Sequence, residues 1–359
     1  MIYGKEFEDR KNKVNQICKN YIKKDDLILL RTLYSCANIN EVQPGNNLKD
    51  KLSKTPFSNE SMGKFLTHFK KEEFSKYSTQ NLEVLFQELH NRQCKALNYE
   101  PRCIVSVSRN IDTSTNGYMT PGTNKLNMNG AMISRYNYIP ASYNNYGKNM
   151  VTIGAHSALT LIHETQHACQ MEGIMNFALN RETSKEQRGK DALFFLKMAV
   201  SNYAQEKDSK ALKDYIKNNY VYDFMEHDAN MAAVKFVRDQ IKQGNIKDDV
   251  FLDALAYRTT RDIHLEEQPL VNRIATMEVV IKKYMELFNA IFKDGPLKQQ
   301  LSKALNEYTK VDKNGHSPLR DGLIRDFEEA KQLIDYCKQN SNHHSKERDN
   351  DGPVLRLTR

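Results

Sequence analysis

Residues 163–167 read His-Glu-Thr-Gln-His, and this HExxH spacing constrains the chain more than any other feature of its sequence. On an α-helix, residues i and i+4 lie on one face about one turn apart, so His163 and His167 can bind a single metal ion. Zinc accepts such nitrogens at about 2.0–2.1 Å. Glu164 is placed to reach a zinc-bound water, whose pKa falls towards about 7, and to accept its proton. The motif therefore predicts a helix that carries two ligands of a zinc site, and Ser157 is its expected N-cap residue.

A catalytic zinc site needs a third protein ligand, which must come from elsewhere in the chain. The third histidine of an HExxHxxGxxH pattern is absent after His167. Residues 226–230 read Glu-His-Asp-Ala-Asn within a stretch of helical character, which makes Glu226 the leading candidate. Asp228 and His227 remain alternatives. Glu172 would share the helix of the two histidines, but it lies on the wrong face for the same metal.

An HExxH helix followed by a helix with the pattern Glu-x-x-Ala-Asn resembles the gluzincin branch of the zincin metallopeptidases, over about residues 101–240. The resemblance implies that Glu226 is the third zinc ligand and that Asn230 hydrogen-bonds a zinc-binding histidine. The amide oxygen of Asn230 can accept an imidazole N–H and fix its tautomer. The family also implies a small sheet before the HExxH helix, whose edge strand pairs with an extended peptide. Residues 125–128 are the best candidate for that edge.

The remaining patterning predicts an α+β fold that is mostly helical. Only 15 Gly and 9 Pro occur in 359 residues, and apolar residues recur at helical spacing over most of the chain. Residues 103–108 alternate and predict a strand, and residues 117–128 predict a hairpin. We expect a zincin-like core with a small β-sheet before the HExxH helix and helical extensions at both ends. The predicted division is an N-terminal helical region 1–100, a metallopeptidase core 101–245, a C-terminal helical region 246–339 and a disordered tail 340–359.

Composition narrows the choice of partners and compartment. The formal net charge is +8, and no nucleic-acid motif accompanies the lysine-rich helices, so we do not expect a nucleic-acid partner. No apolar run is long enough to span a membrane, and the first residues lack the apolar core of a signal peptide. Six cysteines without CxxC spacing indicate reduced thiols. These features favour a cytoplasmic protein, with export by a non-Sec system into a target cell as the alternative. The Lys/Asn-rich composition is typical of an AT-rich bacterial source.

Two classes of function are consistent with these residues. The first is a zinc metalloendopeptidase that hydrolyses a peptide bond of a protein substrate, with Glu164 activating a zinc-bound water. The second is a non-catalytic zincin-like or helical protein-binding module; an effector protease that acts in another cell is a variant of the first. Hydrolysis also needs a donor for the developing oxyanion, for which Tyr222 and His227 are candidates. The sequence names no substrate and leaves the oligomeric state open.

Overall fold

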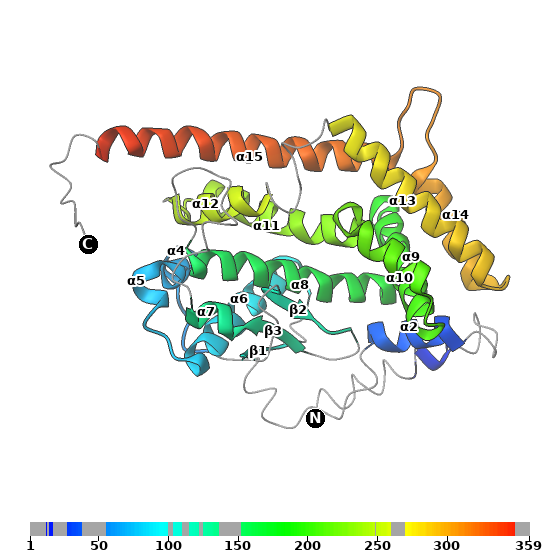
Figure 1. Ribbon diagram of the computed structural model, residues 1–359, viewed down its shortest axis with the longest axis horizontal. Coiled ribbons are helices and arrows are strands. Elements are labelled where there is room, and N and C mark those ends of the chain that lie inside the picture. The colour runs from blue at the N-terminus through cyan, green and yellow to red at the C-terminus, as the bar shows by residue number, and fades with distance from the viewer. Residues whose placement is uncertain are drawn as a thin grey trace.

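The computed structural model describes residues 27–37, 55–99, 103–109, 115–121, 125–135, 152–247, 249–259 and 270–348, together with Asn12 and Val14–Gln16. Within these residues the protein is mostly helical and has a three-stranded sheet (Figure 1). The expected α+β, mostly helical class is therefore confirmed. No helix in the described ranges combines the length and apolar character that crossing a membrane requires.

Helix α8 (Ile153–Ala178) runs through the centre of the molecule and carries the HExxH motif (Figure 1). Its residues are buried on nearly every side, which is typical of a helix whose apolar residues do not gather on one face. Helices α6 (Thr79–Ala96), α9 (Lys185–Glu206) and α11 (Phe224–Lys242) pack against it. His163 and His167 therefore stand on a helix that is enclosed on nearly every side.

The start of α8 differs from the sequence prediction. Thr152 precedes the first helical residue, whereas Ser157, the expected N-cap, is a buried residue inside the helix. Ile153 and Ala155 are themselves buried, so one more turn removes further apolar surface from water. Burial of this turn outweighs the local preference of serine for a helix start.

The sheet has the strand order β1–β3–β2, with β1 (Ile104–Ser108), β2 (Gly117–Met119) and β3 (Lys125–Asn129). Strands β2 and β3 are antiparallel, which confirms the predicted hairpin. Strand β1 pairs in parallel with β3, on the side away from β2. The prediction that residues 125–128 form the edge is therefore wrong, because β1 occupies the second side of β3. The strand next to α8 at the edge of the described sheet is β2.

The outer edge of β1 is closed by side chains of α6. The Gln87 amide accepts a hydrogen bond from Val105 N at 2.9 Å and donates one to Cys103 O at 3.0 Å. Glu83 accepts one from Val107 N at 3.0 Å. These contacts satisfy backbone groups that would otherwise be available to another strand. Strand addition to this sheet is therefore favoured at β2 and not at β1.

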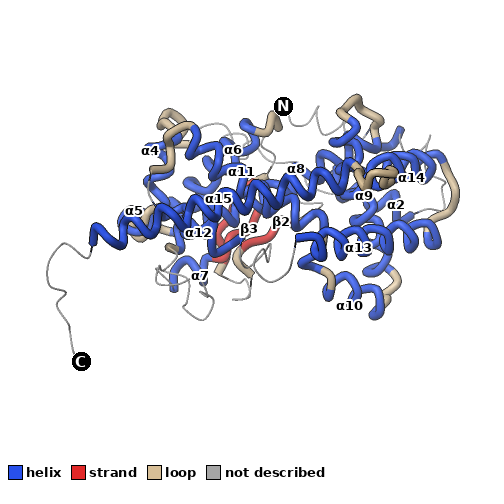
Figure 2. Tube along the Cα trace, turned by 90° about the horizontal axis from the view of Figure 1, so that it is seen from above, coloured by secondary structure: helices blue, strands red, loops and turns tan. Residues whose placement is uncertain are grey.

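The other helices surround α8 in two groups. Figure 2 shows α4, α5, α6, α7 and α12 with the sheet in one half of the molecule, and α2, α9, α10, α13 and α14 in the other. Helices α8 and α15 extend across both halves. The bounds are α2 Leu27–Ala37, α4 Met62–Leu66, η1 Thr67–Phe69, α5 Lys71–Phe74, α7 Gly130–Arg135, α10 Lys210–Asn218, η3 Tyr220–Tyr222, α12 Asp249–Arg258, α13 Leu270–Ile291, α14 Pro296–Thr309 and α15 Pro318–Arg348.

One hydrophobic core extends through all of these elements, from Val14 near the N-terminus to Leu333 in α15. The helical segments before and after the sheet thus pack on the same core as the HExxH helix. Helix α15 continues to Arg348, beyond residue 340, where the disordered tail was predicted to begin. Residues 341–345 are Ser, Asn and His, which are weak helix formers, so this extension continues the turns that precede it, and only Lys346, Glu347 and Arg348 at its end favour a helix by themselves. Residues 349–359 of the predicted tail lie outside the described residues.

Candidate metal centre

Three side chains converge between α8 and α11. The Nε2 atoms of His163 and His167 lie 3.1 Å apart. The carboxylate of Glu226, in the first turn of α11, places Oε2 3.4 Å from His163 Nε2 and Oε1 3.6 Å from His167 Nε2. A zinc ion with tetrahedral bonds of about 2.0–2.1 Å separates its ligand atoms by about 3.3 Å. The cluster therefore fits a zinc ion, and among the described residues it is the one His/Cys/Asp/Glu group with atoms close enough to share a metal.

Both histidines are oriented by amide side chains. His163 Nδ1 lies 2.8 Å from Asn230 Oδ1, and His167 Nδ1 lies 2.8 Å from Gln170 Oε1. An amide oxygen can only accept a hydrogen bond, so each Nδ1 carries the proton and each Nε2 presents its lone pair to the metal position. Asn230 thus occupies the position that the family resemblance implied. The sequence reasoning missed Gln170, whose signal is its spacing of three residues after His167 on the same helix.

The orientation of Gln170 is itself determined by its neighbours. Its amide nitrogen donates to Met225 O and to Asp228 Oδ2, each at 2.9 Å. Gln166 donates to the same Asp228 oxygen at 2.8 Å. The amide oxygen of Gln170 must therefore face His167. This network links the α8 histidine to α11 independently of Glu226.

The close approach of α8 and α11 brings Glu226 to the histidines. Ala229 and Ala233 of α11 are buried, and their small side chains allow the two helices to lie close together. Helix α11 begins after Asp223, which accepts a hydrogen bond from Met225 N at 2.8 Å and pairs with Lys197 of α9. This cap determines where the first turn of α11 starts and hence where the Glu226 carboxylate lies.

The alternative third ligands have other partners. Asp228 is occupied by the two glutamines described above. The His227 ring lies 3.4 Å from Asp326 and packs on Phe327 of α15, on the far side of α11. Glu172 lies 3.8 Å from Arg181. None of these three carboxylate or imidazole groups belongs to the cluster of His163, His167 and Glu226.

Glu226 and His167 shift each other's pKa. Burial disfavours the charged forms of both Glu226 and His167, but the attraction between them is stronger. The pKa of Glu226 is therefore well below its ordinary value, and the pKa of His167 is raised to about 9. The imidazole proton must leave before His167 can bind a cation, so a metal ion would replace a positive charge that the site already stabilises.

Glu164 lies beside the cluster on the side of the sheet. Its carboxylate is buried, and Oε2 accepts a hydrogen bond from the Met119 backbone N–H of β2 at 2.9 Å. Glu164 is not part of the cluster of His163, His167 and Glu226, and its role beside a bound metal stays a prediction. The contact with Met119 connects the candidate base directly to the edge strand.

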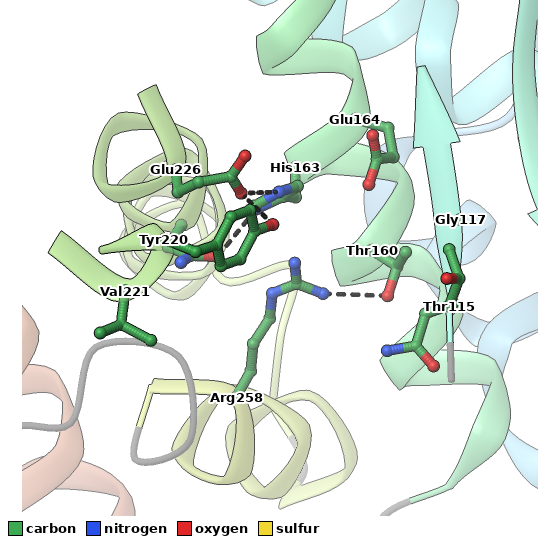
Figure 3. A pocket seen from close by; sticks show the side chains of 11 residues that line it. Thr115, Gly117, Thr160, His163, Glu164, Tyr220, Val221, Glu226 and Arg258 are labelled. Atoms are coloured by element: carbon green, nitrogen blue, oxygen red, sulfur yellow. Dashed lines mark hydrogen bonds and ion pairs between the residues drawn. The ribbon is translucent and has the colours of Figure 1, made fainter. Parts of the chain in front are cut away.

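Two cavities share the cluster as part of their walls. One has a volume of about 290 Å³ and extends from His163 and Glu164 to Arg258 of α12 (Figure 3). The other, of about 340 Å³, extends to His167 and Lys197. Strand β2 borders both, so together they form an extended depression along the edge strand.

Tyr220 lines both cavities and donates a hydrogen bond to Glu226 Oε2 at 2.6 Å (Figure 3). The sequence candidates for an oxyanion donor are placed differently. Tyr222 has the Arg273 guanidinium 5.3 Å from its ring centroid, and His227 faces α15. Among the described residues, neither lines either cavity. Tyr220 also lies near Glu226 in the sequence, but no local pattern distinguished it from Tyr222 or pointed to Arg258, because both positions depend on which elements pack around them.

Comparison with known proteins finds no protein-family model, no curated protein and no solved structure that matches this chain.

Proposed function

We propose that this protein is a zinc-dependent metallopeptidase that hydrolyses a peptide bond of a protein or peptide substrate. The observation that carries the proposal is the spacing of His163 Nε2, His167 Nε2 and the Glu226 carboxylate, with both histidine Nδ1 atoms held by amide oxygens. Two imidazoles and one carboxylate form a donor set used by catalytic zinc sites, which keep a further position open for water or substrate.

The two histidines and Glu226 would hold the zinc ion, which supplies Lewis acidity that lowers the pKa of a coordinated water to about 7 and polarises a carbonyl. Glu164 would accept the proton of the attacking water and deliver it to the leaving amine. The Met119 N–H holds the Glu164 carboxylate in a defined orientation for both transfers. We favour Tyr220 as the donor to the developing oxyanion, since its hydroxyl already lies beside a zinc ligand.

The register of the sheet supports substrate binding along β2. Asn129 N donates to Asn116 O at 3.0 Å and Thr120 N donates to Lys125 O at 3.4 Å, so the residues between them alternate between facing β3 and facing away from it. Gly117 and Met119 are the residues of β2 whose backbone groups point away from β3. An extended peptide would pair with the Gly117 backbone groups and the Met119 carbonyl, across the mouth of both cavities, while the Met119 N–H stays on Glu164.

A reducing compartment such as the cytoplasm suits this proposal. Among the described residues, Cys36, Cys94, Cys103 and Cys169 are buried and form no disulfide. Burial raises the pKa of the Cys36 thiol far above its ordinary value, so this thiol stays protonated and unreactive at neutral pH.

Metal analysis and a Glu164→Gln variant test the proposal. We expect about one zinc ion per wild-type chain by elemental mass spectrometry, and loss of that zinc in Glu226→Ala. Glu164→Gln should keep the metal but cleave a library of tryptic peptides from a cell lysate at least about a hundredfold more slowly than the wild type. Glu172→Gln serves as a matched control, because Glu172 is on the same helix but outside the cluster.

Two results would contradict the proposal. One is a folded wild-type protein that binds no zinc. The other is undiminished cleavage by zinc-loaded Glu164→Gln, since no other group in the proposal accepts the proton of the attacking water.

A further inference from the structure

Four methionines line the cavity on the His167 side of the metal cluster, and we call this cavity the methionine pocket. They are Met119, Met171, Met198 and Met225, which come from β2, α8, α9 and α11. Met171 follows His167 by four residues, so it lies on the same face of α8, one turn further along. The methionine pocket therefore adjoins the metal position.

The four methionines make the wall of this pocket continuous with the hydrophobic core. Met171 and Met225 are buried, and Met171 Sδ lies 3.7 Å from the Sγ of Cys36 in α2. Met119 and Met198 are partly buried and pack on the same core. The pocket has a volume of about 340 Å³, within the range of about 300–1,000 Å³ that is usual for ligand pockets. Methionine side chains are flexible and polarisable, so such a wall adapts to large apolar groups of different shape.

The charges of the lining also favour an apolar ligand. Besides the metal cluster and Glu164, the charged residues that line the described pocket are Lys197 and Asp223, and these two form an ion pair with each other. The Lys197 ammonium group also lies 5.4 Å from the centroid of the Tyr284 ring. A charged substrate side chain would lose water in this pocket and meet a pair of charges that already match, which is unfavourable. An apolar side chain would gain by leaving water.

The direction of β2 indicates which part of a substrate would reach the methionine pocket. A Cβ added at Gly117 would lie 3.2 Å from the Thr160 side chain. Met119 N donates to Glu164, about one turn further along α8, so β2 and α8 run in the same direction. The end of β2, with Met119 and Pro121, therefore borders the methionine pocket. Antiparallel pairing is the more stable kind, and a peptide that pairs antiparallel to β2 places its N-terminal part beside this end.

We propose that the methionine pocket binds a large apolar side chain of the substrate on the N-terminal side of the cleaved bond. The inference rests on the proposed peptidase function and adds the substrate class, which is peptides with Leu, Met or Phe within about three residues before that bond. The flexible wall accepts all three side chains, whereas small or charged side chains at this position leave the pocket unfilled or poorly solvated.

The first measurement uses the zinc-loaded wild-type protein and the tryptic peptide library. Aligning the products at the cleaved bond should show Leu, Met or Phe enriched at one position before that bond. The best peptide is then synthesised with Leu, Phe, Ala or Asp at this position. Replacing Leu by Ala should lower kcat/KM by about tenfold to a hundredfold, because the burial of a large apolar side chain is lost. Replacing Leu by Asp should lower it at least as much.

Variants of Met198 then connect this preference to the methionine pocket. Met198→Phe partly fills the pocket and should reduce the preference for Leu over Ala by about fivefold or more. Met198→Ala enlarges it and should raise the ratio of Phe to Leu cleavage by about fivefold or more. The matched controls are Met285→Phe and Met285→Ala, which should keep the wild-type preference. Met285 of α13 is also partly buried and packs on the core, but it is not among the described residues that line either cavity.

Binding without turnover provides a second measurement of the preference. Calorimetry of the Leu and Ala peptides with zinc-loaded Glu164→Gln should show tighter binding of the Leu peptide by about tenfold or more. Circular dichroism and zinc content verify that each variant is folded.

The outcomes separate this inference from the proposed function. Equal cleavage of the Leu and Ala peptides by the wild type, or an apolar preference only after the cleaved bond, would overturn the inference and leave the peptidase intact. A wild-type preference that stays unchanged in both Met198 variants would place the apolar side chain elsewhere and would also overturn it. If the wild-type protein binds no zinc and cleaves no peptide, the proposed function fails, and the inference fails with it.

Discussion

Asp191 is a buried acid where α9 packs against α8, and we expect it to make the free energy of unfolding depend on pH. Its side chain is 1% exposed, and its Oδ1 accepts a hydrogen bond from Gln187 Nε2 at 2.8 Å. Oδ1 also lies so close to Gly173 of α8 that a Cβ added there would be 2.3 Å away. Burial raises the pKa of Asp191 from 3.8 to about 6, more than the hydrogen bond from Gln187 lowers it.

The sign of the effect follows from where the proton is held. Between pH 4 and pH 6 the folded protein keeps the proton of Asp191, whereas the unfolded chain releases it. The contribution of Asp191 to the free energy of unfolding therefore decreases as pH rises through this window. A rise of about two pKa units corresponds to a destabilisation of the folded protein by about 3 kcal/mol. This destabilisation is complete above the folded pKa of about 6 and is absent below the unfolded pKa of 3.8.

Asp191→Asn keeps the size and the acceptor oxygen but removes the charge. We expect the variant to be more stable than the wild type by up to about 3 kcal/mol at pH 7.5, and by less than about 1 kcal/mol at pH 4. Urea unfolding of both proteins at the two pH values measures this difference. Asp294→Asn is the control, since the Asp294 side chain is 88% exposed and its replacement should change stability by less than about 0.5 kcal/mol. A difference between Asp191→Asn and the wild type that does not change with pH would refute the reasoning.

Two further predictions concern the helices around the metal centre. Asn230→Ala and Gln170→Ala should each weaken zinc binding by about 10- to 100-fold, because each removes the acceptor for the Nδ1 proton of His163 or His167. Competition with a chromogenic chelator measures the loss, and unchanged affinity in both variants would contradict this role. Gly173→Ala should destabilise the protein by about 1–3 kcal/mol, because the added methyl group would meet the Asp191 carboxyl. Thermal unfolding at pH 7.5 measures the change. Gly244→Asn is the control and should destabilise less, because Gly244 has a φ of +71°, which asparagine tolerates, and open space around it.

Much of the candidate site follows from local helical geometry. His163 and His167 share a face because they are four residues apart on a helix, and the same spacing puts Glu226 and Asn230 on one face of α11. The chemistry of imidazole and carboxylate groups then limits what such faces can bind. The hairpin of β2 and β3 is equally local, because its two strands are separated by a short turn.

Other parts of the site depend on contacts between residues that are far apart in the sequence. The edge strand is β2 because β1 reaches across to pair with β3, and no feature within residues 125–128 distinguishes a central strand from an edge strand. His227 and Glu226 are adjacent, yet one faces α15 and the other the metal position, since packing on both sides of α11 sets its rotation.

The sequence by itself therefore determined most of the elements and which side chains could bind a metal, because hydrophobic periodicity and i to i+4 spacing act over one or two helical turns. Only the tertiary structure decided which other side chains lie around these groups. Arg258 reaches Thr160 across 98 residues of chain, and Gln170 faces His167 because Asp228 and the Met225 carbonyl on another helix hold its amide nitrogen. Such contacts arise from how helices dock on a shared core, and docking depends on the shape of whole surfaces, which no short stretch of sequence contains.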